Sequence, residues 1–280
     1  MLIKVESVTH QYDDMGESVL NDINFSINKN EFVSLIGHTG SGKSTLVQIL
    51  NGLIKPISGQ VFLSGEDITG KDVDLKKVRQ QVGLVFQYPE HQLFEETVYQ
   101  DVAFGPKNLG LSEETIEDRV KDSLKSVNLE YEEFKDRSPF KLSGGQQRRV
   151  AIAGVLAMRP KVLILDEPTA GLDPRTRIEL MEEIIKFKEE FNLTIILVSH
   201  RMEEVFQLAD RILVLSEGQL VFNESPTELT SNYHELQQLG LGVPEITEVL
   251  VNLKEKGYDL NTNIFDILSA KDEIIKVLRS

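Results

Sequence analysis

The feature that most constrains this chain is a glycine-rich run at residues 37–44, with the sequence GHTGSGKS. It matches the phosphate-binding pattern G-x-x-x-x-G-K-[ST], which needs a buried strand before it and a helix after it. The flanking residues supply both. EFVSLI at 31–36 is an apolar strand pattern, and Leu46, Ile49 and Leu50 recur at helical spacing. The order strand, loop, helix predicts a site for a nucleoside triphosphate.

Composition excludes several kinds of protein. The chain holds 45 Asp and Glu against 30 Lys and Arg, whereas nucleic-acid binders need a cationic surface that displaces counterions. The one candidate basic patch is Gln146-Gln147-Arg148-Arg149. The absence of cysteine removes disulfides and thiolate metal sites and fits a reducing cytosol. No run approaches about 18 uninterrupted apolar residues, so we expect a soluble chain that reaches a membrane through partner proteins.

Apolar strand patterns alternate with helical patterns along most of the chain, which predicts an α/β fold with a mostly parallel sheet covered on both faces. Expected strands include 82–86, 162–165 and 194–198, and residues 11–18 are expected to form a loop. A helix-rich stretch at about 88–147 predicts a helical subdomain inserted into this core. Residues 226–280 change to short amphipathic helices. They are too few to bury much alone, so we expect them to pack on the core or on another subunit.

Cleavage of a β–γ phosphate bond needs charge neutralisation, a metal ion, an oriented water and a group that takes its proton. Backbone N–H groups from Gly40 to Thr45 are expected to cradle the phosphates, with Lys43 reaching the β and γ oxygens and Ser44 offering its hydroxyl to Mg²⁺. Asp166 ends an apolar strand, where ligands bind in open α/β sheets, and is expected to hold hydrated Mg²⁺. Glu167 is the candidate general base.

Together with further motifs, these residues resemble the ATP-binding-cassette (ABC) ATPases, over about residues 1–225. Six elements occur in the family's order and spacing: GHTGSGKST as Walker A, Gln87 as the Q-loop glutamine, LSGGQ at 142–146 as the signature, VLILDE at 162–167 as Walker B, AGLD at 170–173 as the D-loop, and His200 as the switch histidine. The implied fold is an ABC ATPase nucleotide-binding domain: a RecA-like P-loop core with an antiparallel β subdomain and a helical subdomain. A small α-helical C-terminal extension follows it here.

The resemblance implies a head-to-tail dimer in which one subunit alone holds two incomplete half-sites. Ser143, Gly144 and Gly145, followed by Gln146, would close over the γ-phosphate held by the other subunit's Walker A. Asp173 belongs to the D-loop. Hydrolysis would open the dimer, and that motion would be the output.

The resemblance also gives roles to single residues. Tyr12 fits the aromatic side chain that stacks on adenine, and His200 fits the contact to the γ-phosphate. Gln87 would touch Mg²⁺ or the water and sense the transport partner. The residues implied to bind ATP are Tyr12, Gly37, His38, Thr39, Gly40, Ser41, Gly42, Lys43, Ser44 and Thr45. The implied Mg²⁺ ligands are Ser44, Gln87 and Asp166, and the implied catalytic residues are Glu167, His200 and Gln87.

The segment PEHQLFEETV after Gln87, together with the helical tail, resembles the energy-coupling factor (ECF) type of cassette protein. Within that type it is most similar to the second of two non-identical ATPase subunits. Such ATPases drive uptake of vitamins, cobalt or nickel in prokaryotes. The implied partners are a paralogous ATPase, a transmembrane coupling subunit and a substrate-binding membrane subunit. The implied location is peripheral, at the cytoplasmic face of the cell membrane.

Other classes carry similar motifs. Chromosome and DNA-repair ATPase heads insert a long coiled coil between Walker A and signature, and the distance from Lys43 to Ser143 leaves no room for one. Translation factors of this kind carry tandem cassettes, whereas this chain has one. The ATPase subunit of another ABC importer or exporter stays open, because only the segment after Gln87 and the tail argue against it.

Overall fold

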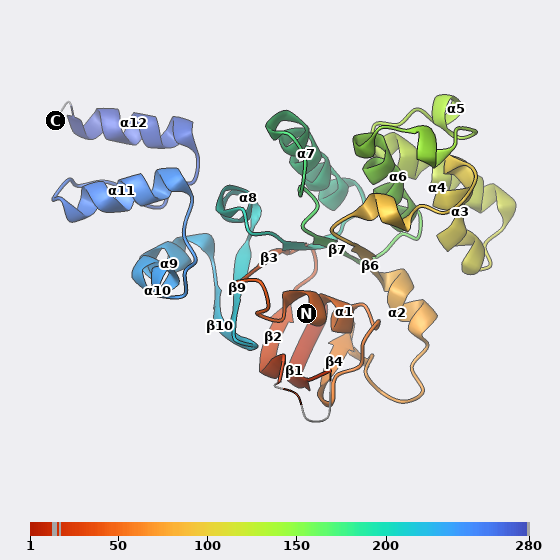
Figure 1. Ribbon diagram of the computed structural model, residues 1–280, viewed down its shortest axis with the longest axis horizontal. Coiled ribbons are helices and arrows are strands. Elements are labelled where there is room, and N and C mark those ends of the chain that lie inside the picture. Colours follow the sequence, from red (N-terminus) through yellow and green to blue (C-terminus); the bar gives the residue numbers. More distant parts are fainter. Residues whose placement is uncertain (13–15, 17, 279–280) are drawn as a thin grey trace.

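The main sheet of the molecule carries the glycine-rich run. The computed structural model describes residues 1–12, 16 and 18–278. Its six-stranded sheet has the order β10-β9-β3-β8-β7-β6, in which β10 runs antiparallel to β9 and the other pairs are parallel (Figure 1). The strands are β3 (Phe32–Ile36), β6 (Val82–Val85), β7 (Val162–Asp166), β8 (Thr194–Val198), β9 (Arg211–Ser216) and β10 (Gln219–Glu224). The predicted parallel core is therefore present.

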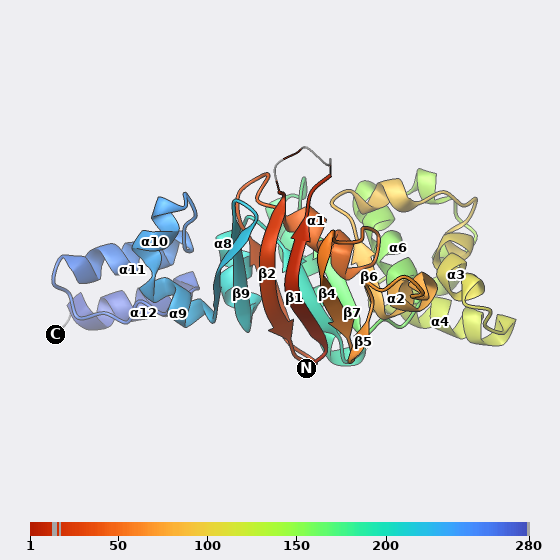
Figure 2. The same cartoon turned by 90° about the horizontal axis from the view of Figure 1, so that it is seen from below.

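A smaller antiparallel sheet lies beneath the main one, in the order β2-β1-β4-β5. Its strands are β1 (Ile3–His10), β2 (Leu20–Ile27), β4 (Ser58–Leu63) and β5 (Glu66–Asp67). Helix α1 (Lys43–Leu50) lies between the two sheets, where Leu46 and Ile49 share an apolar cluster with Val5 and Ile196 (Figures 1 and 2). Burial on both sides fixes the direction in which the helix N-terminus points. Part of the loop predicted at 11–18 falls on residues 13–15 and 17, which lie outside the described residues.

The helix-rich stretch forms a unit at the β6 end of the main sheet (Figure 1, yellow and green). It contains α3 (Val98–Asn108), α4 (Glu113–Ser126), α5 (Tyr131–Phe134) and α6 (Gly144–Leu156), with 3₁₀ turns η1 (Pro89–Gln92) and η2 (Pro139–Lys141). Ser112 accepts a hydrogen bond from Thr115 N–H, as expected of the N-cap of α4. Helix α2 (Leu75–Gln81), capped by Asp74, was not among the predicted elements.

Helices α7 (Pro174–Glu190) and α8 (Met202–Leu208) cover the face of the main sheet opposite α1. This arrangement follows from the alternation of side chains along each strand, because successive side chains point to opposite faces of the sheet. Leu163 and Leu165 pack in a cluster with Ile184 of α7, whereas Ile164 packs in the cluster that contains α1. The sheet is thus buried on both faces.

Residues 226–278, which we name the C-terminal extension, form α9 (Pro226–Ser231), α10 (Tyr233–Gln238), α11 (Glu245–Glu255) and α12 (Ile267–Leu278). Leu229 and Leu236 pack against the core residues Phe206 and Val214, as expected for a segment too small to be stable alone. Helices α11 and α12 form a separate small cluster that projects away from the sheet (Figures 1 and 2). Among the described residues, no helix has the length and apolar character that crossing a membrane requires.

Candidate nucleotide-binding site

Four neighbouring strands bring the predicted site residues to one edge of the main sheet. β3 leads into the glycine-rich loop, Gln87 follows β6, Asp166 ends β7, and His200 follows β8. Because the strands are parallel and adjacent in the order β3-β8-β7-β6, their carboxyl ends meet at the same edge. Residues that are far apart in the sequence therefore lie together around one site.

The glycine-rich loop turns sharply and leaves backbone N–H groups free for an anion. Gly42 has φ 100°, and a Cβ built on it would lie 2.6 Å from Leu20 Cδ2 and 2.7 Å from the Val19 carbonyl oxygen. Only glycine fits such a position. Within the described residues no side chain caps the N-terminus of α1, and the hydroxyl of Ser41 is buried without a hydrogen-bond partner. Unsatisfied donors at a helix N-terminus suit a phosphate group.

Lys43 lies between the loop and two carboxylates. Its Nζ donates to the carbonyl oxygens of Gly37, at 2.6 Å, and His38, at 2.8 Å. Burial lowers the pKa of Lys43, and the negative charges of Glu167 and Asp166 act in the opposite direction. Burial, and then the neighbouring Glu167, raise the pKa of Asp166, while Lys43 and a hydrogen bond from Ser44 lower it. A cation beside Asp166 would relieve the repulsion between the two acids.

Glu167 and His200 form a pair across the ends of β7 and β8. Glu167 Oε2 lies 2.8 Å from His200 Nδ1, and because a carboxylate accepts, Nδ1 is the donor. Glu167 has φ 49°, a left-handed conformation, and its N–H donates to the Val198 carbonyl oxygen at 2.9 Å. The backbone turn after β7 thus aims the carboxylate at His200.

Two cavities meet at these side chains. One, of about 500 Å³, runs from Tyr12 along the loop to Asp166; the other, of about 570 Å³, runs from the loop to His200. They share Thr39, Lys43, Gln87 and Glu167. The shared wall makes one elongated site with an aromatic side chain at one end and the Glu167–His200 pair at the other.

Tyr12 stands at the rim of the first cavity. Its hydroxyl lies 2.9 Å from Thr45 Oγ1, and its ring meets the His10 ring edge-on, with centroids 5.0 Å apart. The residue is 61% exposed, so its ring has a face open to solvent. A planar base can stack on such a ring.

The donors near the loop suit Mg²⁺, which prefers oxygen ligands and keeps several waters. The Ser44 hydroxyl and the Asp166 carboxylate lie side by side, and Gln87 lines both cavities. In the part of the chain that the structure describes, no three His, Cys, Asp or Glu side chains gather as a metal site of their own. The Ser44 hydroxyl and the Asp166 carboxylate are the neighbouring oxygen donors that could hold such an ion.

The signature residues lie elsewhere in the molecule. Ser143 caps α6, accepting a hydrogen bond from Gln146 N–H, while Gln146 Oε1 accepts from Ser143 N–H at 3.1 Å. Apart from its chain neighbours and the backbone of α6 itself, a Cβ built on Gly144 or Gly145 meets no atom of the described chain within 4 Å. Asp173 caps α7 and accepts from Thr176 Oγ1 at 2.6 Å. One chain does not bring these residues to either cavity.

The sequence singled out Arg148 and Arg149 only as a possible basic patch, and the structure gives them other partners. Arg148 is 4% exposed, and its Nη1 donates to the carbonyl oxygens of Pro168, at 2.7 Å, and Ala170, at 3.1 Å. Arg149 Nη2 lies 3.0 Å from Glu183 Oε1. Arg148 thus joins the signature helix to the turn after Glu167, a role that no local sequence signal reveals.

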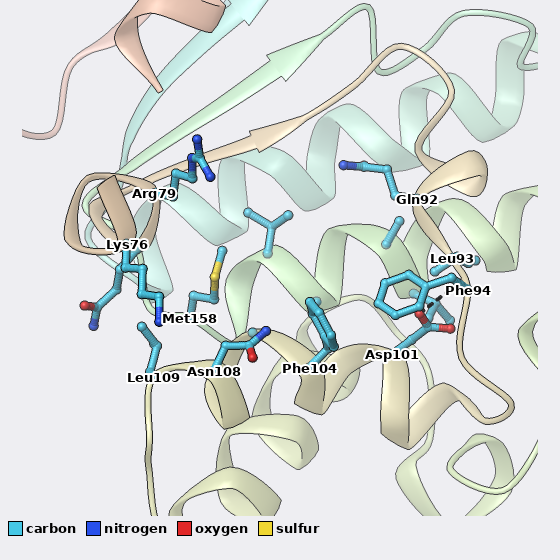
Figure 3. A pocket seen from close by; sticks show the side chains of 16 residues that line it. Lys76, Arg79, Gln92, Leu93, Phe94, Asp101, Phe104, Asn108, Leu109 and Met158 are labelled. Carbon is cyan, nitrogen blue, oxygen red and sulfur yellow. Dashed lines mark hydrogen bonds between the residues drawn. The ribbon is translucent and has the colours of Figure 1, made fainter. Parts of the chain in front are cut away.

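A second groove lies between α2, α3 and α6, about 550 Å³ in volume (Figure 3). Phe94, Phe104 and Met158 make its wall apolar, and the Phe94 and Phe104 rings meet edge-on with centroids 4.8 Å apart. Asp101 is buried there and accepts hydrogen bonds from the N–H groups of Phe94 and Glu95. Burial raises the pKa of Asp101. The segment that supplies Phe94 begins at Gln87, so the groove adjoins the nucleotide site along the chain.

Known proteins resemble this chain in sequence and in fold. Residues 20–170 match the ABC transporter family. Over its full length the chain is 52% identical to the energy-coupling factor transporter ATP-binding protein EcfA2 of Clostridium tetani and covers 98% of it. It is 40% identical, with TM-score 0.75, to cbiO1 from Clostridium perfringens, part of the ABC transporter complex cbiONQ; 85% of this chain and 94% of that one are covered. The ATP-binding cassette MJ0796, solved as a post-hydrolysis dimer bound to ADP and Pi, is 34% identical to this chain with TM-score 0.71. The match covers 80% of this chain and 99% of that one.

Proposed function

Because this chain belongs to the ABC transporter family, and within it to the ATP-binding proteins of energy-coupling factor transporters, we propose that it powers the uptake of a vitamin or another micronutrient by hydrolysing ATP between its phosphate loop and the Glu167–His200 pair. The observation that carries the proposal is the convergence of Lys43, Asp166, Glu167 and His200 on one elongated cavity. ATPase chemistry belongs to the family. The assignment of each residue is our proposal.

We assign the aromatic end of the cavity to adenine and the opposite end to the γ-phosphate. Tyr12 offers its open ring face to the base, and the stretch from Gly40 to Thr45 offers backbone N–H groups to the phosphates. Lys43 would exchange its bonds to two backbone carbonyls for bonds to the β and γ oxygens. His200, paired through Nδ1, keeps Nε2 for the γ-phosphate.

We assign Mg²⁺ to Ser44 and Asp166, with Gln87 as the third group. When bound, the ion would neutralise charge on the β and γ oxygens. Ser44 offers a neutral hydroxyl, and Asp166 offers a carboxylate whose raised pKa reports its burial beside Glu167. A bound cation would offset the negative charge of Asp166, so that Glu167 would remain as the one acidic group of the pair whose charge is not offset.

Glu167 takes the proton of the attacking water in our proposal. The water oxygen forms a bond to the γ-phosphorus while the bond between that phosphorus and the bridging oxygen breaks, giving ADP and phosphate. The proton moves to Glu167, whose carboxylate is oriented by His200 at 2.8 Å. A positioned general base of this type contributes about 100- to 10,000-fold to the rate.

A second ATPase subunit completes the site, and we propose that it is a paralogue of this chain. Ser143, Gly144 and Gly145 stand open at the start of α6 and lie apart from both cavities of their own chain. Head-to-tail pairing lets each signature close over the nucleotide held by the other subunit, near Asp173 of the D-loop. The dimeric form of the similar cassette MJ0796 supports a dimer.

The groove of Figure 3 is our proposed docking site for the transmembrane coupling subunit. Its apolar wall of Phe94 and Phe104 suits the apolar face of a helix, and the buried Asp101 suits a cationic side chain on that helix. The chain runs from this wall to Gln87, which links docking to the nucleotide. We accordingly place the chain at the cytoplasmic face of the membrane, with residues 1–225 as the ATPase domain and 226–280 as its extension.

Affinity purification of the tagged full-length chain from its native membranes, in mild detergent, tests this assignment. We expect mass spectrometry to find a second LSGGQ-containing ATPase together with a coupling subunit and a substrate-binding membrane subunit. Recovery with a conventional permease pair, or with no membrane protein, would contradict the energy-coupling factor role while leaving the ATPase chemistry intact.

A further inference from the structure

A turn of the C-terminal extension lies against the phosphate loop. Residues 239–242 follow helix α10, and the backbone oxygen of Leu239 is hydrogen-bonded to Nε2 of His38, the second residue of the glycine-rich run. Residues 240–242 also line the cavity that contains Glu167 and His200. About two hundred residues of sequence separate the two sides of this contact, so it arises only in the folded chain.

The turn is a fixed structure that its own bonds hold in place. Gly240 has φ +64° and donates to the Gln237 carbonyl oxygen at 2.8 Å, while Leu241 N–H donates to Leu236 at 2.9 Å, a common end for a helix. Leu239 and Leu241 pack against an apolar cluster that includes Ile36, the last residue of β3. The same cluster therefore supports the turn and the start of the phosphate loop.

Glycine at position 240 makes the close approach to His38 possible. A Cβ built on Gly240 would lie 3.0 Å from His38 Cε1 and 3.1 Å from Nε2, closer than ordinary van der Waals contact. A side chain there would push the imidazole away from the Leu239 oxygen. The turn and the histidine thus determine each other's position.

His38 links this turn to the phosphate-binding lysine. Its ring nitrogen donates to Leu239, because a carbonyl oxygen only accepts, and its own carbonyl oxygen accepts from Lys43 Nζ at 2.8 Å. When phosphate oxygens take the lysine, the His38 carbonyl loses that partner. Binding of the nucleotide would therefore alter the contacts of His38, the residue that joins the phosphate loop to the C-terminal extension.

We propose that His38 and Gly240 are positioning residues through which the C-terminal extension holds the phosphate loop ready for ATP. The inference rests on the proposed nucleotide site. A loop that is ordered before ATP arrives loses less conformational freedom on binding, so the contact strengthens affinity. By thermodynamic linkage, ATP binding must change the stability of the turn.

Calorimetric titration of the full-length chain with the magnesium complex of AMPPNP, an ATP analogue that is not hydrolysed, tests the proposal. His38→Leu removes the donor and Gly240→Ala displaces the ring, and each should weaken binding about three- to tenfold, as expected for one lost hydrogen bond. His38→Gln keeps a donor and should recover most of the affinity that His38→Leu loses. Gly257→Ala is the matched control, because Gly257 also has positive φ, +98°, but meets no atom of the described chain within 4 Å.

The double variant shows whether the two residues act together. If they share one contact, His38→Leu with Gly240→Ala weakens binding no more than either change alone. Fully additive effects, or a His38→Gln variant as weak as His38→Leu, would overturn the proposal. Hydrogen exchange of wild type gives a measurement that needs no variant: AMPPNP must change the exchange of residues 236–243, and unchanged exchange despite measured binding overturns the inference alone. Wild type that binds no AMPPNP would overturn the nucleotide site itself.

Discussion

At the scale of the residue, our proposal makes turnover depend on Glu167. Glu167→Gln keeps the shape of the side chain beside His200 but removes the carboxylate that we propose takes the proton from water. We expect steady-state phosphate release to fall by at least about 100-fold, while ATP-dependent association with the second ATPase, measured by size-exclusion chromatography, persists. Asp74→Asn, which makes the same carboxylate-to-amide change at the exposed cap of α2 outside both cavities, is the control for a nonspecific loss of stability. Turnover close to wild type in Glu167→Gln would contradict the general-base assignment.

At the scale of the element, α3 carries the wall of the groove that we propose as the docking site. Phe104→Asp places a second carboxylate near the buried Asp101, in a wall that suits an apolar partner (Figure 3). Because Phe104 is exposed, we expect the chain to fold and bind ATP. Co-purification of the coupling subunit should fall about tenfold or more, while the second ATPase is still recovered. Val221→Asp, which changes an exposed apolar residue on β10 at a distance from the groove, should leave recovery unchanged. Full recovery with Phe104→Asp would place the docking surface elsewhere.

At the scale of the whole molecule, the signature lies apart from both cavities of its own chain. We therefore expect a change in the signature to affect ATP hydrolysis but not the binding of ATP by the isolated chain. Gly145→Asp introduces a charge at an open position away from its own chain's phosphate loop, so affinity of the isolated chain for ATP should stay within about twofold of wild type. Hydrolysis in the assembled transporter should be lost at the site that this signature completes. Lys43→Ala should instead weaken ATP binding in the isolated chain. Equal loss of affinity in both variants, measured by nucleotide titration, would argue against a composite site.

The sequence predicted much of this molecule because its signals are local. The strand before Lys43, the apolar strand before Asp166 and the cap at Ser112 each follow from neighbouring residues, and the relatives confirm the predicted ABC fold and energy-coupling factor type. Contacts between distant segments left no such signal. The burial of Arg148 against the turn after Glu167, and the approach of Gly240 to His38, depend on how finished elements pack.

The left-handed backbone conformation of Glu167 lowers the stability of the fold at the position that we propose for the general base. A non-glycine residue with φ near 49° costs about 1 kcal/mol, and here it also places a second acid beside the buried Asp166. Glycine at this position would relax the backbone and remove the repulsion, so we expect Glu167→Gly to melt several degrees above wild type in calorimetry while hydrolysing no ATP. A melting temperature below that of wild type would contradict this expectation. Selection for thermal robustness alone would therefore tend to discard the glutamate that we propose as the general base, and its presence fits a site kept for turnover at the expense of the stability of the fold.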